Sequence, residues 1–326
     1  METTRSEYKQ RHRKKRRKRK ALLVLFLLFL VIGTGVASYE YMAGKRDAMG
    51  EAEGNLEESQ YKNDFQGVDN KDGKTTVLLL GIDKNEKEEV RRTDTIMIAQ
   101  YEPGEKKAKL ASLMRDTYVN IPGHGYNKLN AAFALGGPEL LRQTIEENFG
   151  ISTEYYSIVD FDGFTQIVDT VAPDGIEVDV DHRMYHEGAV DLQPGTQKLH
   201  GEELLGYARY RGDADSDFGR VNRQQEVIKL MKDEVVSAKG LLKVPRLVGT
   251  IQPYIDTNIS NSKMVGLGKD FIFNAPDNID TLRIPVEGSY WDERDSNAGS
   301  VLAHDEQVNR EALQEFFGLK EENTTN

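Results

Sequence analysis

The stretch TTVLLLGI, residues 75–82, decides the fold of this chain of 326 residues. Its continuous apolar run ends at Asp83, a pattern typical of a central strand that is buried on both faces. Two further strands are predicted behind it, TDTIMIAQY at 93–101 and KAKLASLM at 107–114. The turn Glu102-Pro103-Gly104 joins these two strands into a predicted hairpin, so a sheet is expected from Thr75 onward.

Helices alternate with strands in the rest of the chain. The first helix is expected to begin at Pro138, because Gly136-Gly137 precedes it, and to end at Gly150. Strands interleaved with helices favour the α/β class, with a mixed central β-sheet sandwiched by helices. The predicted helices are 138–149, 162–171, 201–210, 218–238, 262–273 and 306–318, and the further strands are 155–161, 175–180 and 281–286.

The N-terminus combines a basic tail with an apolar run. Residues 1–20 hold eleven Lys or Arg and two acids, although the whole chain has a formal charge of −11. Residues 21–38 (ALLVLFLLFLVIGTGVAS) carry no charge, and as a helix they would span about 27 Å, close to the hydrocarbon thickness of a bilayer. The run therefore predicts one transmembrane signal-anchor helix. The positive-inside rule then places residues 1–20 in the cytoplasm and the remaining chain outside, as in a type II protein of the cell membrane.

Two other interpretations of this N-terminus are weaker. A cleaved signal peptide would need a shorter apolar core, and Gly35-Val36-Ala37 is only a weak match to a cleavage site. A basic cluster can also bind nucleic acid, but beside a membrane span it more often sets topology and contacts anionic lipid. Membrane lipid is therefore an expected partner, and nucleic acid is not.

The remaining chain divides into two predicted parts. Residues 39–74 are polar and poor in apolar side chains, which predicts an extracytoplasmic stalk. Residues 75–326 are predicted to form one folded domain. The chain has no cysteine, so thiolate chemistry and cysteine zinc sites are excluded, and an exported domain without disulfides favours a Gram-positive cell surface.

Charged residues collect at the boundaries of the predicted strands. Asp83 follows the first strand, Asp94 opens the second, and Arg115 and Asp116 follow the third. Ligand-binding groups gather where the strands of open α/β sheets end. Solvated charges are the more common explanation there, because strand ends emerge into solvent, so these positions alone are weak evidence for a site.

The segment YARYRGDADSDFGRVNRQQEV, residues 207–227, is more informative. On a helical wheel, Arg220, Arg223 and Gln224 share the stripe that becomes apolar at Val227 and Met231. These side chains should therefore point inward, where a guanidinium needs an anion. That anion could be an internal carboxylate or a bound ligand. The segment holds four arginines (Arg209, Arg211, Arg220 and Arg223) and no lysine, which favours a phosphate or carboxylate ligand.

Familiar catalytic motifs are absent from the sequence. It holds no Gly-x-Ser-x-Gly, no phosphate-binding P-loop and no dinucleotide-binding fingerprint. His182 and His186 are four residues apart but have no evident third ligand, so a zinc site there is not expected.

Four separated blocks resemble the LytR-CpsA-Psr family of cell-wall proteins, and within it the MsrR-type branch. They are VLLLGIDK (77–84), RRTDTIMI (91–98), LMRDTYVNIPGHGYNKLNAAFALGGPEL (113–140) and LLGYARYRGDADSDFGRVNRQQEVI (204–228). The blocks occur in family order, and the resemblance covers residues 75–290. It implies an enzyme that transfers an anionic glycopolymer, such as teichoic acid or capsular polysaccharide, from an undecaprenyl-pyrophosphate carrier to peptidoglycan.

The resemblance also implies roles for individual residues. Asp83 and Asp94 match acids associated with Mg²⁺, and with Arg115 they are the expected catalytic groups. One departure from the family pattern is Lys84-Asn85, where many relatives have an arginine, so no role is assigned to that loop. The expected pyrophosphate-binding residues are Arg92, Arg115, Asn130, Arg209, Arg211, Arg220, Arg223 and Gln224.

Two alternative functions use the same pocket. A polyprenyl-pyrophosphate phosphohydrolase would let water attack where a transferase uses a sugar hydroxyl. A non-catalytic lipid-binding sensor or transcriptional attenuator is the other alternative. The cytoplasmic tail has no helix-turn-helix pattern, which weighs against direct gene regulation.

Overall fold

The computed structural model describes residues 38–46, 61–69, 72–83, 93–186, 190–212, 216–236 and 244–319. The predicted basic tail and the apolar run lie outside these residues, except for Ser38, as does Arg92. Within the described part of the chain, no helix is both long enough and apolar enough to cross a bilayer.

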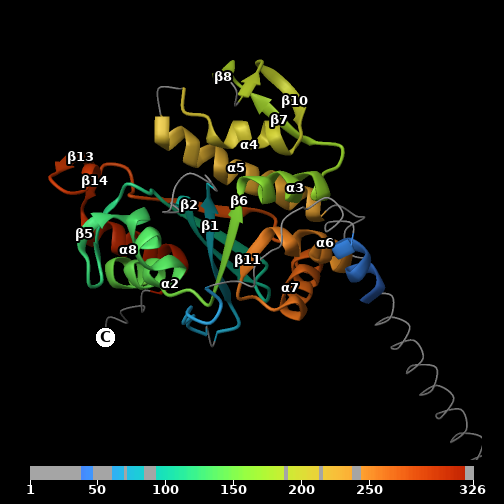
Figure 1. The fold of residues 1–326 in the computed structure, drawn as a ribbon, viewed down its shortest axis with the longest axis horizontal. Helices are drawn as coiled ribbons and strands as arrows, with labels where there is room; N and C mark the ends of the chain where they lie inside the picture. Colours follow the sequence, from blue (N-terminus) through green and yellow to red (C-terminus); the bar gives the residue numbers. More distant parts are fainter. Residues whose placement is uncertain are drawn as a thin grey trace, which may run out of the picture.

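A mixed six-stranded sheet forms the centre of the molecule, as predicted (Figure 1). Its strand order is β11-β6-β1-β2-β3-β12. β1 pairs antiparallel with β2 and parallel with β6, and β3 pairs antiparallel with β2 and parallel with β12. The strands are β1 (Thr75–Ile82), β2 (Thr93–Glu102), β3 (Lys107–Leu113), β6 (Tyr155–Asp160), β11 (Ile255–Thr257) and β12 (Ile279–Ile284).

Helices cover both faces of this sheet. On one face, alternate residues of β1 (Leu78, Leu80 and Ile82) share a buried core with α2 (Leu129–Phe149) and α8 (Glu306–Phe317). On the other face lie α5 (Ser216–Val236) and α7 (Asn261–Phe273). The amide of Gln225 on α5 donates to Ser112 Oγ of β3, and Phe271 of α7 packs against Tyr101 of β2.

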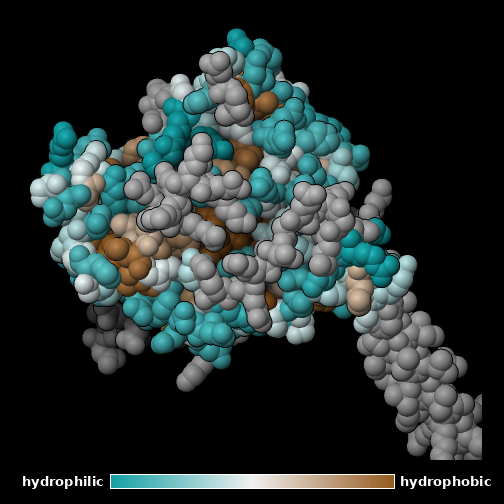
Figure 2. Space-filling view, in the orientation of Figure 1, coloured by the Kyte–Doolittle hydropathy of each residue, from teal (hydrophilic) through white to brown (hydrophobic). Residues whose placement is uncertain are grey.

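An upper layer lies over the end of the sheet (Figure 1). It has its own core, in which α3 (Phe161–Val171), α4 (Gly201–Arg209) and α5 pack on small hairpins. Figure 2 shows hydrophilic atoms over this layer and apolar atoms gathered on the α2–α8 side. The hairpin strands are β7 (Ile176–Val180) with β10 (Gly195–Leu199), and β8 (Met184–His186) with β9 (Val190–Leu192).

The helix predicted to begin at Pro138 starts nine residues earlier, at Leu129. Gly136 and Gly137 depart from helical geometry, and Gly137 has a φ of 65°, a conformation that favours glycine. The Gly-Gly pair therefore kinks α2 instead of preceding it. The prediction of that boundary was wrong because a Gly-Gly pair followed by proline is found both at a kink within a helix and just before the first turn of a helix.

Several short elements were not expected from the sequence. They include β4 (Tyr118–Ile121) paired with β5 (Gly125–Lys128), β13 (Tyr290–Asp295) paired with β14 (Gly299–His304), α6 (Val244–Ile251), and the strands β8, β9, β10 and β11.

Residues N-terminal to Thr75 also pack on the domain. Phe65 is buried in the main core and its ring meets Tyr156 at a centroid distance of 4.9 Å. Residues 38–46 form a helix against α6 (Figure 1), and a Cβ added at Gly249 would lie 2.2 Å from the carbonyl oxygen of Tyr41. The described parts of the segment predicted as a stalk therefore contact the domain.

Candidate functional site

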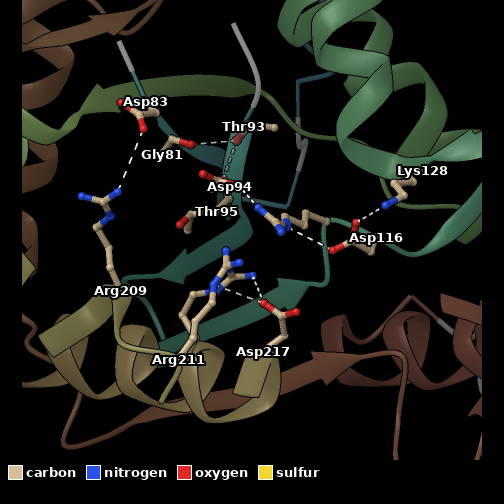
Figure 3. A network of polar contacts seen from close by, with 12 residues as sticks. Gly81, Asp83, Thr93, Asp94, Thr95, Asp116, Lys128, Arg209, Arg211 and Asp217 are labelled. Carbon is tan, nitrogen blue, oxygen red and sulfur yellow. Dashed lines mark hydrogen bonds and ion pairs between the residues drawn. The ribbon is translucent and has the colours of Figure 1, made fainter. Parts of the chain in front are cut away.

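The strand arrangement brings four chain segments to one edge of the sheet. β1 and β3 end at the edge where β2 begins, because both pair antiparallel with β2. This places Asp83, Asp94 and Arg115 in one region, as Figure 3 shows for the two acids. β6 is parallel to β1, so Phe161, the first residue of α3, lies at the same edge.

Arg115 lies at the centre of a chain of ion pairs, whose other members Asp94, Asp116 and Lys128 are labelled in Figure 3. Its Nη1 donates to Asp94 and its Nε lies 3.0 Å from Asp116 Oδ2, while Lys128 Nζ lies 2.8 Å from the other oxygen of Asp116. Burial lowers the pKa of Arg115, but the carboxylates of Asp116 and Asp94 outweigh it and raise that pKa overall. Burial raises the pKa of Asp116, but Lys128 and Arg115 outweigh it and lower that pKa. Arg115 and Asp116 are therefore both held charged.

Further arginines reach the same region from the upper layer. Arg209, at the end of α4, stacks its guanidinium 3.8 Å from the Phe161 ring centroid and comes within 4.0 Å of Asp83. Arg211 Nε lies 3.4 Å from Asp217 Oδ1. Arg220 Nη2 lies 3.0 Å from that same oxygen, so one carboxylate holds two guanidinium groups.

Arg220 is buried, as the wheel predicted, with 3% of its surface exposed. Its internal partner is Asp217, but its Nε and Nη1 have no hydrogen-bond partner among the residues that the structure describes. Buried donors without acceptors are rare and cost about 1–3 kcal/mol each. The two donors are therefore suited to an anionic ligand.

Asp94, Arg115 and the three arginines of the upper layer line a cavity of about 800 Å³. Four of its lining residues are arginines and two are acids, so the cavity has an excess of positive charge. Phe161, Val190 and Leu205 give it an apolar portion. The polar lining consists of Asp94, Thr95, Arg115, Tyr185, His186, Glu202, Arg209, Tyr210, Arg211, Arg220 and Gln224.

Three expected site residues that the structure describes lie outside the lining: the pyrophosphate-binding candidates Arg223 and Asn130, and the metal-binding candidate Asp83. Arg223 is buried and donates to the carbonyls of Tyr207, at 3.1 Å, and Tyr210, so it fixes the α4–α5 connection. The backbone N–H of Asn130 donates to the Arg115 carbonyl at 3.1 Å, which ties the start of α2 to the site. Asp83 faces Arg209 at the cavity's edge.

The structure adds residues that the sequence interpretation did not select. Asp217 precedes Arg220 by three residues, a spacing that predicts an ion pair on a helix. Asp116 was noted only as a neighbour of Arg115, and Lys128 stands far from both in the sequence. Nothing in the sequence indicated the Lys128 contact, because it depends on how the β4–β5 hairpin folds.

The two acids at the sheet edge fit Mg²⁺. The ion usually takes one or two protein carboxylates and fills its other positions with water and phosphate oxygens. Asp83 and Asp94 offer such a set, although Arg115 already engages one oxygen of Asp94. Among the described residues, no group of three or more His, Cys, Asp or Glu could form a metal site by itself.

The fold and site define a class of cell-wall proteins. The LytR_cpsA_psr family model matches residues 38–314, so the chain belongs to this family. It is 42% identical over 253 residues to the regulatory protein MsrR of Staphylococcus aureus, covering 78% of this chain and 77% of MsrR. This places it in the MsrR-like branch, as predicted.

Transferases and lipid complexes also occur among the relatives. The chain is 31% identical over 241 residues to the polyisoprenyl-teichoic acid–peptidoglycan teichoic acid transferase TagU of Oceanobacillus iheyensis, covering 72% of each protein. Bacillus subtilis TagT with bound octaprenyl pyrophosphate lipid superposes with a TM-score of 0.57 and 27% identity. That match covers 80% of this chain and 97% of TagT.

Proposed function

We propose that this protein transfers an anionic glycopolymer from an undecaprenyl-pyrophosphate carrier to peptidoglycan by phosphoryl transfer. The observation that carries the proposal is the buried Arg220, whose two unpartnered donors point to an anionic ligand. The relationship to TagU supports the substrate class, and the lipid bound to TagT supports the pyrophosphate.

The cavity suits a lipid pyrophosphate, which carries about two negative charges and an apolar tail. Arg115, Arg211 and Arg220 would neutralise the phosphates, and planar guanidinium groups bind phosphate oxygens in pairs. Phe161 and Leu205 would contact the first isoprene units. Phosphoryl transfer depends mainly on positioning and charge neutralisation, which these residues can supply.

In the proposed reaction, an acceptor sugar hydroxyl attacks the phosphorus atom that bears the glycopolymer. A new P–O bond forms as the P–O bond to the lipid-bearing phosphate breaks. Polyprenyl monophosphate leaves with the bonding electron pair, and the hydroxyl proton is released to water. Asp83 and Asp94 would hold Mg²⁺, which would add positive charge beside the phosphates.

We also propose that the reaction occurs outside the membrane. Residues 1–20 would remain in the cytoplasm, and the apolar run 21–38 would anchor the domain beside a substrate that stays in the bilayer. The chain would thus be a single-pass protein of a Gram-positive cell membrane.

The test is transfer by the full-length chain in lipid nanodiscs. The donor is a polyprenyl-pyrophosphate-linked glycopolymer, the acceptor is peptidoglycan glycan, and products are identified by mass spectrometry. We expect a phosphodiester between polymer and acceptor, together with polyprenyl monophosphate. Arg220→Met should abolish turnover, whereas Arg310→Met, a control on α8 away from the cavity, should not.

Two results would contradict the proposal. A free glycopolymer phosphate formed at the same rate with and without acceptor would identify a phosphohydrolase. Lipid binding without any turnover would instead favour a non-catalytic sensor.

A further inference from the structure

A surface of aromatic rings and carboxylates lies beside the cavity, on the β4–β5 and β13–β14 hairpins. The two hairpins are adjacent at the left edge of the molecule (Figure 1), and the backbones of Thr117 and Leu302 bridge them. Tyr126 is 51% exposed and Trp291 is 53% exposed. The aromatic surface comprises Tyr118, Tyr126, Trp291, Glu293, Asp295 and Glu306.

Hydrogen bonds fix the orientation of each ring in this aromatic surface. The Tyr118 hydroxyl donates to Asp295 at 3.0 Å, and the Tyr126 hydroxyl donates to Glu306 at 3.2 Å. The Trp291 indole donates to Glu293 at 3.1 Å. The rings are therefore held in place before any partner binds, which reduces the entropy cost of binding.

The two hairpins present these side chains together. Trp291, Glu293 and Asp295 alternate along β13 and so share one of its faces. Asp295 of that face bonds Tyr118, whose ring lies 5.4 Å from the ring of Tyr126. The pKa of Tyr118 is raised, first by its hydrogen bond to Asp295 and further by burial and by the charge of Glu293. Glu293 shares the face of β13 that presents Asp295 to Tyr118.

The aromatic surface is continuous with the phosphate-binding site. Tyr118 follows Arg115 by three residues and pairs across β4–β5 with Lys128, which bonds Asp116. The N–H of Leu302, on β14, donates to the Asp116 carbonyl at 2.9 Å. In Figure 3, Asp116 and Lys128 lie on the opposite side of Asp94 from Arg209.

This position suits the molecule that attacks the phosphate. In phosphoryl transfer, the attacking and leaving oxygens lie roughly in line, on opposite sides of the phosphorus. A lipid carrier that fills the arginine-lined cavity leaves the Asp116–Lys128 side as the approach for the acceptor. The acceptor would therefore pass over the β4–β5 and β13–β14 hairpins.

The chemistry of the aromatic surface fits an uncharged sugar chain. One side of a pyranose ring presents C–H groups that can stack on an aromatic face, and its edge presents hydroxyl groups that can donate to carboxylates. The second oxygens of Glu293 and Glu306 have no hydrogen-bond partner among the described residues. Three carboxylates would also repel an anionic polymer, which favours the neutral acceptor over the donor's glycopolymer.

We infer that the aromatic surface binds the sugar backbone of the acceptor glycan and directs it toward the phosphate held at Arg115. Tyr126 and Trp291 stack on sugar rings, and Glu293 and Glu306 accept hydrogen bonds from sugar hydroxyls. This inference rests on the proposed transferase function.

The test measures glycan binding without donor, using the full-length chain in nanodiscs and uncharged oligosaccharides of N-acetylglucosamine. Trp291→Ala and Tyr126→Ala should each raise the dissociation constant by about fivefold or more, as expected for an aromatic contact. Trp291→Phe should restore most of the affinity. Phe273→Ala removes a ring that is 65% exposed on α7 and should have no effect.

Transfer assays separate this inference from the proposed function. If the inference holds, Trp291→Ala raises the acceptor KM by a similar factor and leaves the thermal shift caused by octaprenyl pyrophosphate unchanged. If the parent binds glycan through these rings but transfers nothing, the proposed function fails while the sugar site stands. If the parent does not bind the oligosaccharide, or Trp291→Ala and Tyr126→Ala change neither dissociation constant nor KM, the inference is refuted even where transfer is robust.

Discussion

Replacing two nearby arginines of α5 one at a time should show which of them binds the ligand and which supports the fold. Arg220 and Arg223 stand three residues apart and are both buried, but only Arg220 lines the cavity. We expect Arg220→Met to lose lipid pyrophosphate binding with little change in stability. Arg223→Met should instead lose stability and keep its affinity for the lipid. Methionine keeps an unbranched apolar stem, so packing is largely preserved.

The expected stability changes follow from the partners of each side chain. Arg220→Met loses an ion pair with the one-third-exposed Asp217, worth at most about 1 kcal/mol, and Asp217 keeps its contact with Arg211. It also removes two unpartnered buried donors, which offsets that loss. The free energy of unfolding should therefore stay within about 1 kcal/mol of the parent.

Arg223→Met has a different balance. It leaves the carbonyls of Tyr207 and Tyr210 without their guanidinium donor. At about 1–3 kcal/mol for each of the two acceptors, the free energy of unfolding should fall by about 2–6 kcal/mol.

The assay is urea unfolding of the full-length chain in detergent, followed by far-UV circular dichroism, with and without octaprenyl pyrophosphate. Ligand at about 100 times its dissociation constant stabilises the parent by about 2.7 kcal/mol. Arg220→Met should weaken binding by about 100-fold, which corresponds to about 3 kcal/mol, and so reduce that stabilisation to about 0.4 kcal/mol. Arg223→Met should retain the parent's gain. An Arg220→Met protein that loses several kcal/mol but is still stabilised by the lipid would refute the assignment.

Three further predictions address topology, metal and pH. Protease added to intact protoplasts should remove the domain, and full protection would contradict the predicted type II topology. Asp83→Asn should reduce both turnover and its dependence on Mg²⁺ concentration; an unchanged Mg²⁺ response would argue against a metal role. The pKa of Asp116 is lowered in the folded protein by Lys128 and Arg115, so its contribution to stability is complete above about pH 4 and is lost as pH falls further. Melting temperatures measured from pH 2 to pH 7 should therefore decline less steeply on the acid side for Asp116→Asn, and parallel curves would count against this ion pair.

The parts of the fold that could be predicted have local signals. The apolar run at 75–82 and the hairpin behind it gave three neighbouring strands of the sheet. The inward position of Arg220 followed from the helical period, because the polar and apolar parts of its stripe lie on one element. Position does not establish role, so the assignments of the site residues remain predictions.

The parts that could not be predicted depend on distant contacts. YWDERD at 290–295 is too polar to resemble a strand, and it is held by pairing with β14. Phe65 is an isolated apolar residue in a polar segment, so nothing nearby indicated that it enters the main core. The aromatic surface joins residues separated by more than 150 positions, and no pattern along the chain links them.

The helix at 38–46 limits how far the domain can move relative to its predicted membrane anchor. Gly44 and Gly249 let the backbones of this helix and α6 touch, and the amide of Asn261 donates to the Tyr41 hydroxyl at 2.7 Å. If residues 39–74 were a flexible tether of 36 residues, the distance between the domain and the end of the membrane helix would vary over about 30 Å or more. A docked helix that begins where the apolar run ends would instead set the cavity's height and tilt above the lipid headgroups. Encounter with a bilayer-bound substrate would then become a search in two dimensions.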